Sequence, residues 1–257
     1  MTDFTLLNGE DHRDLKLQDN LPYDAMKSLK NCQIIVDEIF LAGSSFPVFF
    51  IKDVEKGQFL LSVIFAFQND GNLFVGQDGW NAPYMPLNIK RQPLALGMEL
   101  AADVLQPHDI YIDLDSELVS SVAGSRLFHE DGSETVFLKD KKRSLGGMVQ
   151  GEEKTQSFID SILKYDLMSP LTITLSTAEG DRLIKGIYGI DHVKMKYMDP
   201  KSYLGLIDEG VLDNIIMMKA SYAQIGRLIW MENKKLWLEN KKSAGKIINY
   251  SISCNQN

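Results

Sequence analysis

The sequence predicts an α+β fold, in which antiparallel sheets are built from hairpins and amphipathic helices lie mainly in the C-terminal half. Two observations predict this class. Short apolar runs bounded by Gly or Asp turns fill the first half of the chain, as expected for strands. Apolar residues recur at helical spacing in the second half, and these helices do not alternate regularly with strands, which argues against a parallel α/β sheet.

The first half is predicted to consist mainly of strands. Short apolar runs that are typical of strands lie at residues 33–36, 47–52, 59–67 and 72–76. A further strand is expected at residues 109–115, and residues 126–138 are expected to hold two strands around the Glu130-Asp131-Gly132 turn. Pro83, Pro86 and Pro93 lack backbone donors, so residues 79–93 are predicted to form an irregular, packed loop.

The second half contains clearer helix signals. Glu152 and Glu153 mark the start of an amphipathic helix, whose apolar face is Phe158, Ile159, Ile162 and Leu163. Residues 171–177 and 182–190 flank a Glu179-Gly180-Asp181 turn and are predicted to form a hairpin. Asp199 and Pro200 begin another helix, which Gly210 ends, and residues 211–229 are expected to form a largely buried helix.

The chain is expected to comprise an α+β domain, residues 1–230, and a basic amphipathic C-terminal extension, residues 231–257. Within the domain, the intervals from Pro47 to Gly57 and from Gly57 to Leu60 recur in the series Pro170, Gly180, Leu183. This repetition predicts two similar sub-lobes, at about residues 33–140 and 150–230, and chance agreement of the two spacings is the alternative.

The C-terminal extension has its own pattern. The segments WMENKK and WLENKK begin at Trp230 and Trp237, so both tryptophans lie on one face of a helix. Residues 231–257 hold five Lys and two Glu, a net charge of +3, which leaves −11 for the remainder because the total is −8. Packing of this helix onto the acidic body is the plainer expectation. The alternative is that a protein partner, a second copy of the chain or a membrane surface binds through Trp230 and Trp237.

Composition disfavours several function classes. A net charge of −8 disfavours a nucleic-acid partner, because binding a phosphate backbone needs a basic face. The longest apolar stretch, residues 59–67, is far shorter than the roughly 20 residues that span a bilayer, so no transmembrane segment is expected. Residues 1–11 lack the features of a secretory signal, and Cys32 and Cys254 do not make a disulfide framework. We therefore expect a soluble, cytoplasmic protein.

A series of short motifs resembles the SapC family of bacterial proteins. In the first half they are His12 with Leu15 and Leu17, Asp37-Glu38-Ile39, Phe46-Pro47-Val48-Phe49-Phe50, Asn72-Leu73-Phe74-Val75, Gly79-Trp80, Tyr84-Met85-Pro86 and Arg91-Gln92-Pro93. The pattern continues through Leu127-Phe128, residues 155–158, 186–191 and 210–212, and residues 221–228. The resemblance covers about residues 12–228 and departs from the family at Gln92 and Leu94, where aromatic residues are common.

The resemblance implies a context more than a reaction. The family is named after a bacterial surface-array locus, and its members often lie near genes for TonB-dependent receptors and tryptophan-halogenase-like flavoproteins. It shares its name with a peptide-transport permease, a role that a chain without a membrane span does not fit.

The candidate ligand-binding residues are Trp80, Tyr84 and Arg91, with Glu38 as a partner. An aromatic ring stacks on a planar ligand and a guanidinium binds a carboxylate through two hydrogen bonds, so these types make a plausible pocket. The alternative is structural: the aromatic residues bury apolar area, and Arg91 caps loop carbonyls or pairs with Glu38, so that together they hold the proline-rich loop on the sheet.

No metal or cofactor is expected. His129, Asp131 and His192 are the residue types of a two-histidine, one-carboxylate iron site, but Asp131-Gly132 is a turn signal and His192 is placed at a strand end. Asp113, Asp115 and Glu117 lack the glycine turn of a calcium loop. Gly146 and Gly151 have the spacing of a phosphate loop, but Glu152 replaces the required lysine.

Three functions follow from these observations. The first is a soluble accessory or binding protein for an unidentified small molecule, serving a nutrient-uptake or modification system. The second is an enzyme with an unrecognised active site, since the scattered histidines nominate no nucleophile and base. The third, a surface-layer structural protein, rests on the family name alone.

Overall fold

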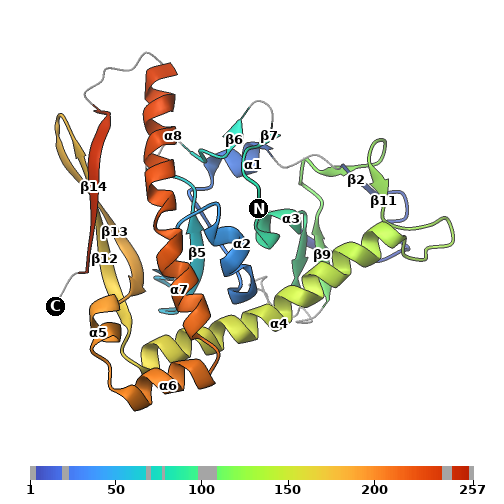
Figure 1. The fold of residues 1–257 in the computed structure, drawn as a ribbon. Helices are drawn as coiled ribbons and strands as arrows, with labels where there is room; N and C mark the ends of the chain where they lie inside the picture. The colour runs from blue at the N-terminus through green and yellow to red at the C-terminus, as the bar shows by residue number, and fades with distance from the viewer. Residues whose placement is uncertain are drawn as a thin grey trace. The chain divides into compact units, whose positions relative to one another are not determined.

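The structure is a computed structural model that describes residues 4–18, 23–67, 71–76, 79–97, 109–238 and 245–254 (Figure 1). The chain divides into two compact units: unit 1 is Met1–Lys27 with Leu87–Gln150, and unit 2 is Ser28–Pro86 with Gly151–Asn257. The units are therefore interleaved in sequence, unlike the two consecutive sub-lobes expected at 33–140 and 150–230. The physical reason is long-range strand pairing within unit 2, which joins β4 (Val48–Lys52) to β13 (Gly180–Ile190).

The described part of unit 1 contains two small antiparallel sheets. The first has the order β1-β9-β8 and consists of β1 (Phe4–Leu6), β9 (Ile110–Asp113) and β8 (Leu94–Leu96). The second has the order β10-β2-β11 and consists of β10 (Val119–Ser120), β2 (Lys16–Leu17) and β11 (Ser125–Arg126). The short helices are α1 (Tyr23–Ser28), which ends at the border of the unit, and α3 (Leu87–Lys90).

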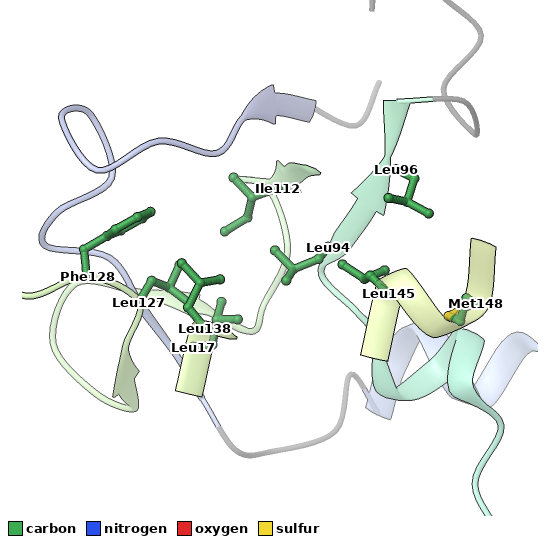
Figure 2. Packing of buried hydrophobic residues seen from close by; sticks show 9 residues of the cluster. All are labelled: Leu17, Leu94, Leu96, Ile112, Leu127, Phe128, Leu138, Leu145 and Met148. Carbon is green, nitrogen blue, oxygen red and sulfur yellow. The ribbon is translucent and has the colours of Figure 1, made fainter. Parts of the chain in front are cut away.

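The core of unit 1 forms where the apolar face of a helix meets these strands. Leu138, Leu145 and Met148 lie on α4 (Val136–Lys164) at helical spacing, and all are buried. Figure 2 shows them with the strand and loop residues of the same cluster: Leu17, Leu94, Leu96, Ile112, Leu127 and Phe128.

Two strands were expected in residues 126–138, around the Glu130-Asp131-Gly132 turn, and the prediction of the second strand is wrong. The turn itself is present, because Gly132 N–H donates to the His129 carbonyl at 3.0 Å and Gly132 has a φ of 83°. Among the described residues of this segment, a single bridge, Phe128 to Glu134, forms outside the named strands. Thr135 then accepts the N–H of Leu138 at 3.3 Å through its hydroxyl, which favours a helix start over a strand.

Unit 2 is built on a six-stranded antiparallel sheet with the order β14-β12-β13-β4-β5-β3. Its other strands are β3 (Asn31–Gln33), β5 (Phe59–Ile64), β12 (Met168–Thr177) and β14 (Ile247–Cys254). The predicted hairpin at residues 171–190 is confirmed as β12 and β13. A separate pair, β6 (Val75–Gly76) and β7 (Gly79–Trp80), is shorter than the strand expected at 72–76.

The helices of unit 2 begin and end largely as local signals predict. Asp199 caps α6 (Pro200–Asp208) by accepting the N–H groups of Lys201 and Ser202, and Gly210 has the positive φ of 69° that was expected after it. The remaining elements are η1 (Val36–Glu38), α2 (Ile39–Gly43), α5 (His192–Lys196), α7 (Leu212–Ser221) and α8 (Gln224–Leu238).

The single helix expected at residues 211–229 is in fact two, α7 and α8. The buried Ser221 hydroxyl donates to the Met218 carbonyl at 2.6 Å and accepts the N–H of Val48 at 3.0 Å, which ties the end of α7 to strand β4. Tyr222 follows and stacks on Phe49, with ring centroids 4.9 Å apart. These tertiary contacts define the break between the helices.

Helix α4 is much longer than the helix expected to start near Glu152, because it begins at Val136. Gly146 and Gly151 therefore lie inside a helix and not in a phosphate-type loop. At Gly151 an added Cβ atom would lie 2.3 Å from the side chain of Ile35. The glycine therefore allows helix α4 to lie close to Ile35, which belongs to the same unit.

The α+β class and the hairpin-built antiparallel sheets are confirmed, as is the concentration of helices in the C-terminal half. The expected C-terminal extension at 231–257 contains the end of α8 and the whole of strand β14, which pairs with β12. This part of the chain therefore contributes a strand to the sheet of unit 2.

Candidate functional site

The predicted loop at residues 79–93 is divided between the two units at Pro86, so its residues are described unit by unit. In unit 2, the Trp80 ring packs against three phenylalanines of the core, at centroid distances of 5.9 Å to Phe46, 5.5 Å to Phe65 and 6.1 Å to Phe74. Its indole N–H donates to the Tyr84 carbonyl at 2.8 Å. Trp80 therefore uses both its apolar surface and its donor to anchor the loop.

Tyr84 is anchored by Glu38. The phenol donates to Glu38 Oε1 at 2.7 Å, and Glu38 Oε2 accepts the N–H of Ile35 at 3.0 Å. Burial, and then the hydrogen bond to the Glu38 carboxylate, raise the pKa of Tyr84 far above that of a free phenol. The phenol consequently remains a hydrogen-bond donor, and the geometry of this pair is that of a structural lock.

The guanidinium that lies beside this aromatic cluster in unit 2 is that of Arg227. It lies 5.2 Å from the centroid of the Phe74 ring and donates to the carbonyls of Asn81 at 3.4 Å and Ser45 at 3.5 Å. Arg91 belongs to unit 1, where it donates to Asn88 Oδ1 at 2.8 Å and to the Leu94 carbonyl at 3.2 Å. The structure thus brings Trp80, Tyr84 and Glu38 together and describes Arg91 within the other unit.

The residues considered for a metal site, His129, Asp131 and His192, are divided between the two units. His129 is exposed at the turn of unit 1, whereas His192 is the first residue of α5 in unit 2 and not a strand end as expected. Asp191 caps that helix, which explains why the strand stops there. Within the parts of the chain that the structure describes, no group of three or more His, Cys, Asp and Glu side chains is placed to hold a metal ion.

A cleft of about 330 Å³ in unit 2, lined by both apolar and polar side chains, is a candidate ligand site. Three elements form its walls: η1, the second half of α4, and the turn from α6 to α7. Its lining residues are Val36, Asp37, Lys154, Ser157, Phe158, Ser161, Glu209, Gly210, Val211 and Asn214. We call this site the α4–α7 cleft. Phe158, Val36 and Val211 are its buried apolar members, and the others supply polar groups.

One side of the cleft carries an exposed ion pair. Lys154 Nζ lies 2.9 Å from Asp37 Oδ2, and the two side chains are 60% and 52% exposed. The backbone next to Asp37 is fixed to helix α4 by Thr155. The buried Thr155 hydroxyl accepts the N–H of Val36 at 2.7 Å and donates to the Gly151 carbonyl at 2.6 Å. The charged pair is therefore solvent-accessible, while its support is rigid.

Glu209 provides the second charged group of the cleft. Its carboxylate accepts hydrogen bonds from Lys164 Nζ at 2.5 Å, from the Ser161 hydroxyl at 2.6 Å and from the Tyr165 phenol at 2.8 Å. These donors, Lys164 first, lower the pKa of Glu209 to about 2. Glu209 is therefore ionised at neutral pH and is a very weak base, so it is unsuited to removing a proton from the Ser161 hydroxyl.

The beginning of α7 also faces this cleft through Val211 and Asn214. Val211 occupies the N-cap position and supplies no side-chain hydrogen bond to the helix. The first N–H groups of a helix have no partner inside the helix and attract negative charge. The cleft thus combines donors, at Lys154 and at the start of α7, with the carboxylates of Asp37 and Glu209.

The cleft residues were not nominated from the sequence. The sequence marks Gly210 only as the end of a helix and Asp37 only as part of the Asp37-Glu38-Ile39 motif, and it gives no signal for Glu209. The one sequence signal for this cleft is the pair of adjacent carboxylates at Asp37 and Glu38. From the sequence, Glu38 was named as a candidate ligand-binding residue, and the structure places Asp37 at the cleft instead. Residues 37, 154 and 209 are too far apart in sequence for spacing to associate them.

Among the described helices, none is both long and apolar enough to cross a membrane. No curated protein and no solved structure is significantly similar to the chain. The family model that matches is SapC, and the match covers residues 7–228. That span contains the Trp80, Tyr84 and Glu38 cluster, all residues of the α4–α7 cleft, and the motifs in which the resemblance was recognised. The chain therefore belongs to the SapC family.

Proposed function

We propose that this SapC-family chain is a soluble bacterial accessory protein that binds a small zwitterionic molecule in the α4–α7 cleft. The observation that carries the proposal is the pairing of opposite charges around one cavity of about 330 Å³. A ligand carboxylate fits the donors at Lys154 and the start of α7, and a ligand ammonium fits Asp37 and Glu209. The volume lies near the lower end of small-molecule sites, which favours a compact ligand.

Binding is favoured over catalysis by the chemistry of the same residues. The Ser161 hydroxyl is the nucleophile type closest to a carboxylate in the cleft, at 2.6 Å from Glu209 Oε2. A carboxylate with a pKa of about 2 does not act as an efficient general base near neutral pH. Catalysis by Ser161 at this site would need a base supplied by the ligand itself. We therefore propose an enzymatic function only as the second candidate.

The proposed setting is the cytoplasm, in service of a nutrient-uptake or modification system. Both cysteines are free thiols, Cys32 buried and Cys254 exposed, which is compatible with a reducing compartment. A protein partner or a second copy of the chain is proposed to bind through Trp230 and Trp237, which are 61% and 75% exposed. The surface-layer role has no structural observation in its favour.

The test is direct ligand detection followed by site variants. Native mass spectrometry of the full chain should show a bound small molecule, and a thermal-shift panel of free amino acids should raise the melting temperature. Lys154→Ala and Asp37→Ala should each weaken binding about tenfold or more, as expected when a charge-assisted hydrogen bond is lost. Lys185→Ala, on an exposed position of β13 outside the cleft lining, is the matched control.

Two results would count against the proposal. One is the absence of any bound molecule together with no response to the panel. The other is ligand binding that is insensitive to both cleft variants, which would place the ligand elsewhere.

A further inference from the structure

Helix α4 presents one stripe of side chains to the α4–α7 cleft. The stripe consists of Lys154, Ser157, Phe158 and Ser161, which all line the cleft and lie on one face of the helix at positions i, i+3, i+4 and i+7. A helix rises 1.5 Å per residue, so the stripe spans roughly 10 Å along the axis. Asp37 pairs with Lys154 at its start and Glu209 binds Ser161 at its end. The charged groups of the cleft are therefore divided between the two ends of the stripe.

The middle of the stripe is apolar. Phe158 is 2% exposed, and its ring is fixed against Phe50 of β4, with the ring centroids 6.0 Å apart. Val36 from η1 and Val211 from the start of α7 are both buried and line the same cleft. Between its two polar ends the cleft thus offers a rigid apolar floor.

Glu209 has an acceptor position left for a ligand. A carboxylate offers about four acceptor positions on its two oxygens. Oε1 accepts Lys164 and the Tyr165 phenol, whereas Oε2 accepts the Ser161 hydroxyl and no other donor in the described chain. The oxygen beside the stripe is therefore the one that can accept a further N–H group, such as that of an ammonium.

Lys154 is available to a ligand at the opposite end. Both members of its ion pair with Asp37 are more than half exposed, and exposed pairs contribute little to stability. A lysine ammonium has three donors, so Lys154 can bind a ligand carboxylate while it keeps or releases Asp37.

We infer that the ligand is an elongated zwitterion that lies along α4, with its carboxylate at Lys154, its ammonium at Glu209 and an apolar middle over Phe158. This inference rests on the proposed binding function and specifies the class of ligand. Such a molecule is narrow as well as long, which agrees with a cleft of about 330 Å³.

The separation of the two ends selects this class. In a free α-amino acid both charged groups are attached to one carbon, about 2.5 Å apart, so the molecule reaches only one end of the stripe. An extended peptide advances about 3.3 to 3.6 Å per residue, so three residues span roughly 10 Å. An ω-amino acid of comparable length has the same chemistry: two opposite charges joined by an apolar chain.

The first test is calorimetric titration of the full chain with probes that differ in charge separation. The probes are free leucine, the tripeptide Ala-Leu-Ala, and ω-amino acids from aminobutanoate to aminooctanoate. Ala-Leu-Ala or aminooctanoate should bind at least about tenfold more tightly than leucine, and whichever binds more tightly identifies the source as a peptide or an ω-amino acid. N-acetylation or C-amidation of that probe should each weaken binding about tenfold or more, because each removes one charge-assisted hydrogen bond.

Site variants then assign the two ends. Lys154→Ala should abolish the response to C-amidation and keep the response to N-acetylation, and Glu209→Gln should do the reverse. Lys185→Ala and Asp208→Asn, at exposed positions outside the cleft lining, are the matched controls and should keep both responses. The titrations with blocked and unblocked probes use the wild type, so they decide the question even if a variant fails to fold.

Three results would each overturn the inference: leucine binding as tightly as both elongated probes, unchanged affinity after either end is blocked, or no binding of any elongated probe. If free amino acids bind and depend on Lys154 and Asp37 without any preference for elongated probes, the proposed function stands and only this inference fails. The two failures are therefore distinguishable.

Discussion

Asp37 and Glu38 are neighbours in one short helix, and the structure gives them opposite environments. The Glu38 residue is 3% exposed, and its carboxylate accepts the Tyr84 phenol and the Ile35 N–H. The Asp37 side chain is 52% exposed and pairs with Lys154 at the rim of the α4–α7 cleft. The same chemical group therefore serves as an interior anchor at one position and as an accessible charge at the next.

The difference teaches which feature marks a ligand site. A buried carboxylate whose hydrogen bonds are made inside the protein stabilises the fold and is not offered to a ligand. An exposed carboxylate in a surface ion pair contributes little to stability, since such pairs are worth about 0 to 1 kcal/mol, yet it is accessible to a bound molecule. The two regions should consequently respond in opposite ways to substitution.

The largest expected effect is on the interior side, at Trp80. Replacing Trp80 by Ala removes its contacts with Phe46, Phe65 and Phe74 and its hydrogen bond to the loop. The free energy of unfolding should fall by about 3 kcal/mol, as for other aromatic truncations in a core. Chemical denaturation measures it.

Trp237→Ala is the control for this prediction, because that side chain is 75% exposed. It should change the free energy of unfolding of the monomeric protein by less than about 0.5 kcal/mol. If Trp80→Ala left stability unchanged, the interpretation of Trp80 as an anchor would be wrong.

The adjacent carboxylates give the next largest effect and the most direct test of the comparison. Glu38→Gln leaves a single acceptor oxygen, because the amide NH₂ group only donates, so one of the Tyr84 and Ile35 donors loses its acceptor and the free energy of unfolding should fall by about 2 kcal/mol. Asp37→Asn should cost less than about 1 kcal/mol, as for other exposed ion pairs. The free energy of unfolding of both variants is measured by urea titration. Equal decreases would contradict the distinction between a buried structural carboxylate at Glu38 and an accessible one at Asp37.

The smallest expected effect is the contribution of Glu209 to the pH dependence of stability. Its pKa is lowered from 4.5 to about 2 in the folded chain. A lowered pKa contributes stability that is present above the unfolded-state value near 4.5 and is lost as the pH falls toward about 2. Because the group lies at the surface, the contribution after solvent screening is about 1 kcal/mol or less.

Glu209→Gln should therefore lower stability slightly at pH 7, and its difference from the wild type should shrink between pH 4.5 and pH 2. Melting temperatures of both proteins across that range provide the measurement. A difference that grew as the pH fell would contradict the proposed role of Lys164, Ser161 and Tyr165 as donors to the Glu209 carboxylate.

Local signals in the sequence determined several elements correctly. Asp199 with Pro200, Gly210 and the Glu179-Gly180-Asp181 turn each act through residues a few positions away, so the start of α6, its end and the β12–β13 hairpin were predictable. The motif order also identified the SapC family, which the match over residues 7–228 shows. The anchoring of Trp80 and Tyr84 was one of the two alternatives that their residue types left open.

Only the tertiary structure decided how these elements combine. Nothing local distinguishes Asp37 from Glu38, whose roles depend on Tyr84 on one side and Lys154 on the other. The break between α7 and α8 depends on Ser221 bonding to Val48, and the place of β14 depends on pairing with β12. Each of these outcomes rests on contacts between segments far apart in sequence, and the free energy of such contacts is set by packing and burial that spacing along the chain does not encode.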